Sequence, residues 1–219
     1  MKRPSTLYAL AGFLWLSPGP SAVVAGAQAA SPKPPVSPKS SAVRVETKTD
    51  AGSVEFVATG WPSALKIHGK GTGPGGTLTV SDHSVSGSLA VDLASLETGI
   101  SLRDRHLKEE YLQVDRYPQA RLTLSHLDVS LLPEGATFGA VAVPFEGRLL
   151  LHGVEKPVRG QAKVSRHDSR LTVSAQFSIN LGDFGVGVPK YMGITVAEKV
   201  DVKAAFSAAV GPFRDVARR

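Results

Sequence analysis

Five segments of this 219-residue chain alternate between apolar and polar residues with a period of two, and this pattern constrains the fold more than any other feature. They are residues 89–93, 141–151, 158–164, 171–181 and 200–206. Successive side chains of a β-strand point to opposite faces, so each segment predicts a strand with one buried and one solvent-exposed face. Long, evenly spaced strands joined by short turns favour an antiparallel meander that closes into a barrel. We therefore expect an all-β domain of about eight antiparallel strands.

One segment predicts a helix, from about Ser101 to about Tyr111. Ser101 can cap the free amide groups of the first turn, and Asp104, three residues later, completes a capping box. Leu102, Leu107 and Tyr111 form a narrow apolar stripe, while the charged residues between them face water. The sequence therefore predicts one short helix that packs against the sheet along one side.

The buried faces of the strands mix many small residues with few large ones, which leaves open whether the barrel is filled or hollow. A barrel of about eight strands is just wide enough for packed side chains or for one small ligand. Small residues leave volume for a ligand, but they can also ease strand crossing or fit the taper of a closed barrel. If the interior is hollow, an apolar tunnel is expected to be lined by Phe145, Leu149, Leu151, Ala175, Phe177, Ile179, Val202 and Phe206.

The two ends of the chain indicate an exported protein with a single folded domain. Residues 1–29 combine early basic residues, an apolar run too short to span a bilayer and a small-residue cleavage site, which predicts a secretory signal peptide. Residues 30–41 predict a proline-rich linker, residues 42–210 one domain, and residues 211–219 a basic tail. The chain has no cysteine, so core packing rather than disulfides must hold the exported domain. We expect a periplasmic or secreted protein after cleavage.

Several motifs that suggest other functions lack the context that those functions need. Residues 71–76 match the dinucleotide pattern G-x-G-x-x-G, but a strand follows them, so we interpret them as a hairpin loop. The six histidines are scattered singly, which argues against a metal site, and no basic stripe with interleaved aromatic residues indicates nucleic-acid binding. Asp104 and His106 stand two apart on the helix and point to different faces. We expect no catalytic residue, no metal and no cofactor.

Several short motifs resemble the signature of the YceI-like family of lipid- and polyisoprenoid-binding proteins. A Thr-Gly turn stands at Thr98–Gly99, an Arg-Asp-x-His-Leu helix at Arg103–Leu107 and a Tyr-Pro-x-Ala strand entry at Tyr117–Ala120. A further motif, His-Gly-Val-x-Lys-Pro-Val, occupies His152–Val158, and Asp-Phe-Gly occupies Asp183–Gly185. Together these motifs indicate a member of that family.

The resemblance covers residues 42–209 and implies a lipocalin-like barrel that encloses an apolar chain. Residues 50–53 depart from the pattern, since many members carry a His-Ser pair there. The resemblance implies an exported binding or carrier protein for a long apolar lipid, a polyisoprenoid or similar amphiphile, and no enzyme. Arg103, His106 and Lys156 are expected to form a polar rim that holds the lipid head group, because an arginine fork suits a phosphate.

Two other functions stay open at this stage. The protein could be a hydrolase or isomerase that modifies such a lipid, or it could be a filled barrel that acts as an envelope stress or interaction module through its outer surface. The expected partner is an isoprenoid or another long-chain lipid. Contact between the basic tail and anionic lipid headgroups, and a homodimer, also stay open, whereas nucleic acid is not an expected partner.

Overall fold

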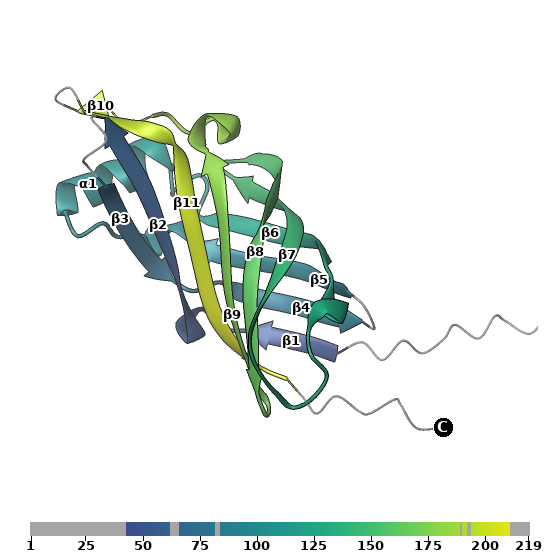
Figure 1. The fold of residues 1–219 in the computed structure, drawn as a ribbon. Coiled ribbons are helices and arrows are strands. Elements are labelled where there is room, and N and C mark those ends of the chain that lie inside the picture. The colour runs from purple at the N-terminus through teal and green to yellow at the C-terminus, as the bar shows by residue number, and fades with distance from the viewer. Residues whose placement is uncertain (1–42, 62–65, 82–83, 189, 192–193, 211–219) are drawn as a thin grey trace, which may run out of the picture. The chain divides into compact units, whose positions relative to one another are not determined.

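A curled antiparallel sheet forms the body of the protein (Figure 1). The computed structural model describes residues 43–61, 66–81, 84–188, 190–191 and 194–210. Within this part of the chain, ten strands follow one another in the order β1-β4-β5-β6-β7-β8-β9-β11-β2-β3, and the short β10 pairs with β11. The strands are β1 (Val43–Thr47), β2 (Gly52–Trp61), β3 (Lys66–Thr72), β4 (Gly75–Ser81), β5 (Ser84–Asp92), β6 (Gln119–Leu127), β7 (Thr137–Leu151), β8 (Val154–His167), β9 (Arg170–Asn180), β10 (Lys190–Tyr191) and β11 (Ile194–Ala209). The predicted all-β antiparallel fold with one short helix is confirmed.

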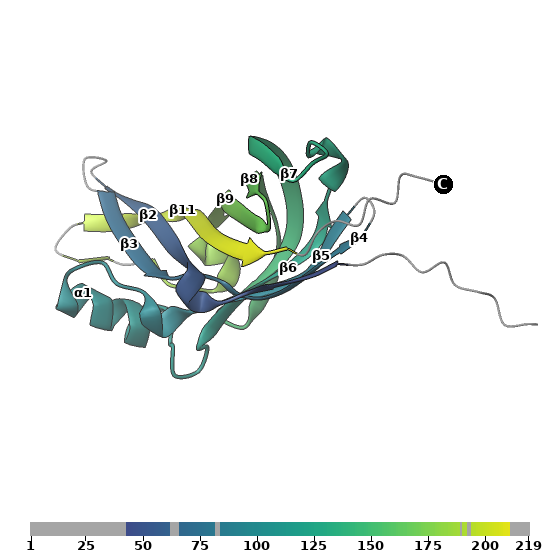
Figure 2. The ribbon, with the colours of Figure 1, turned by 90° about the horizontal axis from the view of Figure 1, so that it is seen from below.

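The expected number of strands, about eight, is wrong by two because two strands near the N-terminus are each divided by a bend. The 3-10 turn η1 (Thr49–Ala51) separates β1 from β2, and Gly73 and Pro74 separate β3 from β4. β1 pairs with β4 and β2 with β3, so the four strands make one long hairpin that bends across both arms. On one side of the bend β2 pairs with β11, and on the other β4 pairs with β5. The bent hairpin therefore holds the sheet in a curl, which Figure 2 shows as a half-barrel.

Two glycines allow this bend because the backbone segments on either side of it touch. A Cβ atom on Gly73 would lie 2.5 Å from the Cα atom of Gly52, and one on Gly52 would lie 2.2 Å from the carbonyl oxygen of Ala205 in β11. The Gly73 amide also donates to the carbonyl oxygen of Thr49 at 3.0 Å. The segment 71–76 is therefore a bend between two strands that do not pair with each other, and not the predicted hairpin loop.

Burial of the strands follows the predicted alternation. In β7 the residues of one parity are buried from Val143 to Leu151, while Glu146 and Arg148 are exposed. The buried side chains form two clusters. The first packs one end of the half-barrel and contains Val45, Leu78, Val85, Leu89, Leu124, Leu127, Val143, Phe145, Ala162, Val164, Val173, Phe206, Ala208 and Val210. The second lies toward the other end and contains Ala58, Leu93, Leu96, Leu112, Leu149, Leu151, Val158, Ile179, Phe184, Val186 and Val200.

The helical segment has the predicted extent, although its geometry changes along its length. The α-helix α1 (Ser101–His106) continues directly into a π-helical turn, η3 (Leu107–Tyr111). The predicted Ser101 cap is wrong, because the helix begins after Ile100 and no side chain caps it. Figures 1 and 2 both show α1 beside the edge strand β3. The remaining helical turns are η2 (Leu93–Ser95), η4 (Val129–Leu131) and η5 (Leu181–Phe184).

The predicted terminal segments lie outside the described residues. They are the signal peptide at residues 1–29, the linker at residues 30–41 and the basic tail at residues 211–219. Within the described ranges, no helix is long and apolar enough to cross a membrane.

We expect Gly73→Ala to lower the free energy of unfolding by about 1–3 kcal/mol, the usual cost of overpacking. The added methyl group would press on the backbone of Gly52, which is held against β11 and cannot move aside. Gly139→Ala in β7 is the matched control, because nothing lies within 4 Å of a Cβ atom there. It should change the stability by less than about 0.5 kcal/mol. Urea denaturation measures all three proteins, and a Gly73→Ala variant as stable as the parent would contradict this account of the bend.

Candidate functional site

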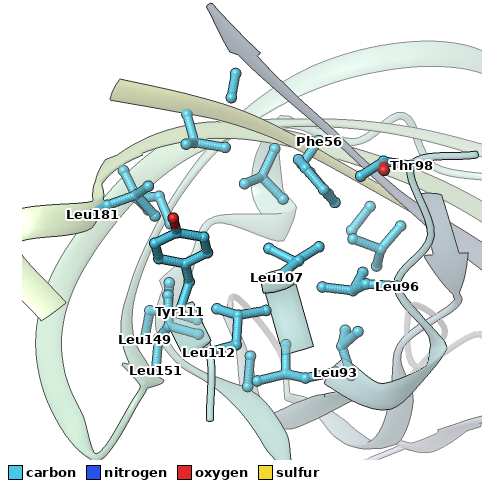
Figure 3. A pocket seen from close by; sticks show the side chains of 18 of the residues that line it. Phe56, Leu93, Leu96, Thr98, Leu107, Tyr111, Leu112, Leu149, Leu151 and Leu181 are labelled. Carbon is cyan, nitrogen blue, oxygen red and sulfur yellow. The ribbon is translucent and has the colours of Figure 1, made fainter. Parts of the chain in front are cut away.

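A cavity of about 480 Å³ lies between the curled sheet and the segment that contains α1 and η3. Figure 3 shows Leu107 of this segment in the middle of the view, among side chains from the sheet, such as Leu149, and from η2, such as Leu93. The volume lies within the range of about 300–1,000 Å³ that is typical of small-molecule sites. The lining consists of Val54, Phe56, Ala58, Ile67, Pro74, Leu89, Val91, Leu93, Leu96, Thr98, Ile100, Leu102, Arg103, His106, Leu107, Tyr111, Leu112, Ala120, Leu122, Leu149, Leu151, Ala175, Phe177, Ile179, Leu181, Val200, Val202, Ala204 and Phe206.

Seven of the eight side chains predicted to line an apolar tunnel lie in this lining. They are Leu149, Leu151, Ala175, Phe177, Ile179, Val202 and Phe206. Phe145 is not part of the lining, because it is only 2% exposed and packs edge-on against Phe177, with 6.1 Å between the ring centroids. Gly160 makes room for this ring, since a Cβ atom there would lie 2.7 Å from it. The half-barrel is therefore packed around Phe145 and hollow beside the helical segment.

The lining also contains residues of the N-terminal strands and of η2 that were not among the predicted tunnel residues. In β2, Val54, Phe56 and Ala58 share one parity and face the cavity, so a period-two signal was available there. Leu93 ends the alternating segment 89–93, whereas Leu96 lies just after the 3-10 turn η2 and follows neither a strand nor a helix period. Only the tertiary structure identifies Leu96 as a lining residue.

The polar side chains of the lining all come from the segment 98–111, and one of them, Arg103, is held in place by Thr98. Nε of Arg103 donates to Oγ1 of Thr98, and Nη2 donates to the carbonyl oxygen of Thr98, each at 2.7 Å. The amide and hydroxyl groups of Thr98 donate in turn to Oδ1 of Asp104, at 2.7 and 2.5 Å. We call Thr98, Arg103 and Asp104 the Thr98 clamp. It ties the loop before α1 to the first turns of the helix, in place of the predicted cap.

The pKa of Asp104 lies below its ordinary value. Burial opposes the charged form, but the two hydrogen bonds from Thr98, together with the positive charges of Lys108 and Arg103, outweigh it. For a carboxyl group whose pKa is lower in the folded state, the stabilisation is present above the unfolded pKa. It is lost as the pH falls through the folded pKa. The Thr98 clamp is therefore stronger at neutral pH than in acid.

Two other polar side chains of the lining keep hydrogen-bonding capacity that no described residue uses. Nε2 of His106 lies 3.8 Å from Oε1 of Glu110, which is too far for a hydrogen bond. The Tyr111 hydroxyl, visible in Figure 3, has no hydrogen bond to any residue in the described ranges. Lys156 does not line the cavity; it is exposed on β8 and borders a separate, smaller hollow with Asp183. We use the term polar rim below for the polar lining side chains His106 and Tyr111 together with the Thr98 clamp. They are spread along the segment, because Figure 3 shows Thr98 and Tyr111 on opposite sides of the view with Leu107 between them.

The cavity opens to solvent at the start of the helix. Ile100 and Leu102 line it, yet they are 53% and 48% exposed. Large apolar side chains that stay exposed beside a cavity are typical of a ligand-binding surface. The opening therefore lies next to the Thr98 clamp, at the start of the same segment.

Motif residues outside the helix meet at the turn that joins β7 to β8. His152 and Gly153 form this turn with φ angles of 51° and 77°, the left-handed conformation that a two-residue hairpin turn requires. The His152 ring lies 4.6 Å from the Tyr117 ring, and Nδ1 of His152 lies 3.3 Å from the carbonyl oxygen of Phe184. Nε2 of His152 is buried without a partner among the described residues. Tyr117, His152 and Phe184 therefore connect the turn before β6, the β7–β8 turn and η5, and none of the three lines the cavity.

Comparison with known proteins identifies the domain. The family model described as a YceI-like domain matches residues 44–208. A polyisoprenoid binding domain from Saccharophagus degradans, implicated in plant cell wall breakdown, has a TM-score of 0.60 and 18% sequence identity, over 76% of this chain and 98% of that chain. BcnA from Burkholderia cenocepacia has a TM-score of 0.61 and 18% identity, over 74% of this chain and 99% of that chain. At this identity the two structures show the shared fold, and no curated protein matches the sequence.

We expect Asp104→Asn to lower the free energy of unfolding at neutral pH by about 1 kcal/mol, since hydrogen bonds to a charged acceptor are stronger than bonds to a neutral one. The deficit should shrink as the pH falls, because the parent carboxylate then becomes protonated. Urea denaturation at a series of pH values tests both statements. Glu109→Gln removes an exposed charge outside the clamp and is the control. A deficit that stays constant into acid would contradict the role assigned to the charged carboxylate.

Proposed function

Because the chain belongs to the YceI-like family, we propose that it is an exported binding protein for a long apolar lipid, a polyisoprenoid or a similar amphiphile. The lipid chain lies in the cavity between the sheet and the helical segment, and its polar end lies at the polar rim. The protein holds and carries the lipid without chemical change. Binding of a polyisoprenoid is the property in the description of the Saccharophagus degradans domain, whose fold this chain shares.

The observation that carries the proposal is the separation of polar and apolar side chains around the cavity. Every described lining residue outside the segment 98–111 is apolar, and every polar one lies within it. Such a cavity matches a molecule with one long apolar part and one small polar end. Each CH₂ group that leaves water contributes about 0.8 kcal/mol, whereas a neutral hydrogen bond contributes about 0.5–1.5 kcal/mol. The chain therefore supplies most of the affinity, and the polar end sets the orientation.

Small side chains leave the space that the lipid chain needs. Ala175 in β9 and Ala204 in β11 are direct cross-strand partners, and both line the cavity. Each is only half-buried, because its methyl group borders the cavity instead of another side chain. Phe177 and Phe206 lie next to them on the same two strands, close to the packed end. We assign this alanine pair to contact with the apolar chain.

A lipid-modifying hydrolase or isomerase is less well supported than a binding protein. Among the described residues no carboxylate is hydrogen-bonded to His106: Asp104 accepts from Thr98, and Oε1 of Glu110 lies 3.8 Å from Nε2 of His106. Among the described residues, no three histidine or acidic side chains gather in a group that could hold a metal ion. A lipid recovered unchanged after prolonged incubation with the protein supports binding alone, and a converted lipid would establish the enzyme.

We also propose that the protein is exported. The pattern of residues 1–29 and the family membership support this. The signal peptide is expected to be cleaved after Ala27 or Ala29, so that the mature protein is periplasmic or secreted and begins with the proline-rich linker. The intact mass of the protein from the extracytoplasmic fraction checks this. A mass that still includes residues 7–16 would mean a retained membrane anchor.

Native mass spectrometry of the mature protein from its own host tests the binding function most directly. The mass should fall by that of a lipid after organic extraction, and the extracted protein should take up a long-chain lipid again. Failure of both would leave the alternative of an envelope stress or interaction module that acts through its outer surface.

We expect Ala175→Leu to weaken the binding of a fluorescent long-chain lipid by about tenfold or more, because the larger side chain takes the place of several buried CH₂ groups. The melting temperature without lipid should stay the same or rise, since the new side chain fills empty space. The matched control is Gln176→Leu, which adds the same side chain to the solvent-exposed face of the same strand and should not change binding. Lower stability of Ala175→Leu together with unchanged lipid binding would contradict the proposed position of the chain.

A further inference from the structure

We propose that the opening of the cavity is a membrane-docking surface, and that the protein rests there on a bilayer that contains anionic lipid. Ile100 and Leu102 enter the bilayer, and Lys66, Lys70 and Arg105 contact its head groups. This inference rests on the proposed function, because it names the partner from which the cavity receives its lipid. The docking surface consists of residues of the folded domain, and not of the basic tail.

Two of the three large apolar side chains that are exposed in the described part of the chain stand at the cavity opening. They are Ile100 and Leu102, and the third is Leu131 in η4. Ile100 directly precedes α1 and Leu102 lies in its first turn. Both line the cavity, so their exposed surface is continuous with its apolar interior. Single exposed apolar residues are common, but an exposed apolar pair that continues into a cavity is typical of an interaction surface.

Exposed basic side chains lie on the neighbouring elements β3 and α1. Lys66 and Lys70 are on β3, whose Ile67 lines the cavity, and Figures 1 and 2 show this strand beside α1. Arg105 is on α1, three residues after Leu102, which makes the two side chains neighbours on the helix surface. Long basic side chains can extend along apolar surface and keep their charge at the head groups of a bilayer. Both elements therefore bring positive charge to the exposed apolar pair.

The acidic side chains of the same region do not cancel this charge. Those of β2 and of the segment 97–111 are Glu55, Glu97, Asp104, Glu109 and Glu110. Glu55 pairs with Lys203 at 3.9 Å, and Asp104 is balanced around the Thr98 clamp. Glu109 and Glu110 lie about 10 Å or more beyond Leu102 along the helical segment, which exceeds the Debye length of about 8 Å in physiological salt. Glu97 is thus left against three basic residues, and the opening has a net positive charge.

A bilayer with anionic lipid is the partner that this combination fits, since it presents an apolar interior beneath charged head groups. It is also the source of the long-chain lipid that the cavity takes up. Each CH₂ group that must enter water lowers the population of free lipid about fourfold, so a long chain that first left the bilayer would be very scarce. An opening that rests on the bilayer lets the chain pass directly from one apolar environment into the other.

Sedimentation with vesicles tests the docking surface on the mature protein after extraction of its lipid. The vesicles contain equal parts of phosphatidylcholine and phosphatidylglycerol. We expect the double variant Ile100→Ser, Leu102→Ser to attach about tenfold more weakly than the parent, or worse, because two apolar side chains no longer enter the bilayer. Leu131→Ser is the matched control, since it removes a similarly exposed side chain from η4, which packs against the first core cluster, and it should attach like the parent. No loss in the double variant, or an equal loss in Leu131→Ser, would overturn the inference.

Charge variants test the electrostatic part of the contact. Arg105→Glu should weaken attachment to the mixed vesicles by about fivefold or more, and should leave attachment to pure phosphatidylcholine vesicles unchanged. Lys163→Glu makes the same change in net charge at an exposed position of β8, between Ala162 and Val164 of the first core cluster, and should have little effect. An equal loss in both variants would show that only the net charge matters, and would overturn the position of the docking surface.

Two further variants test other routes of attachment. The triple variant Arg214→Ser, Arg218→Ser, Arg219→Ser removes the basic residues of the tail, and Ala175→Leu fills part of the cavity. Both should attach to the mixed vesicles like the parent. A loss in the triple variant would assign membrane contact to the tail, and a loss in Ala175→Leu would show that the protein only captures vesicle lipid in its cavity. Either result would overturn the inference.

Lipid binding is measured separately, by titration of the parent with a fluorescent long-chain lipid in the absence of vesicles. We expect the parent to bind this lipid and also to attach to the mixed vesicles. A parent that binds the lipid but does not attach to vesicles would overturn the inference and leave the proposed function intact. A parent that binds no long-chain lipid would overturn the proposed function, and the inference with it.

Discussion

The contact between the backbones of Gly52 and Gly73 is the constraint on which the rest of the structure depends. It lets the N-terminal hairpin bend sharply, so that one half of the hairpin pairs with β11 and the other half with β5. The sheet is thereby held in a curl even though its edge strands, β1 and β3, do not pair with each other in the described part of the chain. A curled sheet with unpaired edges can be packed at one end around Phe145 and still leave space at the other.

The helical segment completes the cavity that the sheet leaves incomplete. The Thr98 clamp holds the loop before α1 against the first turns of the helix. As a result, the polar atoms of the lining are confined to one segment, and the strands contribute only apolar surface. The polar and the apolar parts of the lining therefore come from different elements. The exposed side chains of Ile100 and Leu102 place the opening beside the Thr98 clamp.

Most of the motif residues that identify the family support the fold and do not reach into the cavity. Tyr117, His152 and Phe184 connect three turns through a ring contact and a polar contact. Thr98 and Arg103 line the cavity but form the clamp with Asp104. His106 also lines the cavity, and no described residue uses its hydrogen-bonding capacity. These motifs therefore indicate the fold more directly than they indicate a ligand.

The sequence by itself determined the elements and the direction of most side chains. A period of two assigns every residue of a strand to one of two faces, so seven residues of the lining, among them Ile179 and Val202, could be predicted from local pattern alone. The tertiary structure alone decided what local pattern cannot encode. The bend at Gly73 depends on contact with Gly52 and β11, which are distant in the chain. Phe145 packs in the core and Lys156 borders a separate hollow, so neither lines the cavity. Both positions depend on which part of the half-barrel is packed. Arg103 takes part in the clamp because the loop before α1 brings Thr98 next to it. An irregular loop has no repeating sequence pattern, so this contact could not be predicted from the sequence.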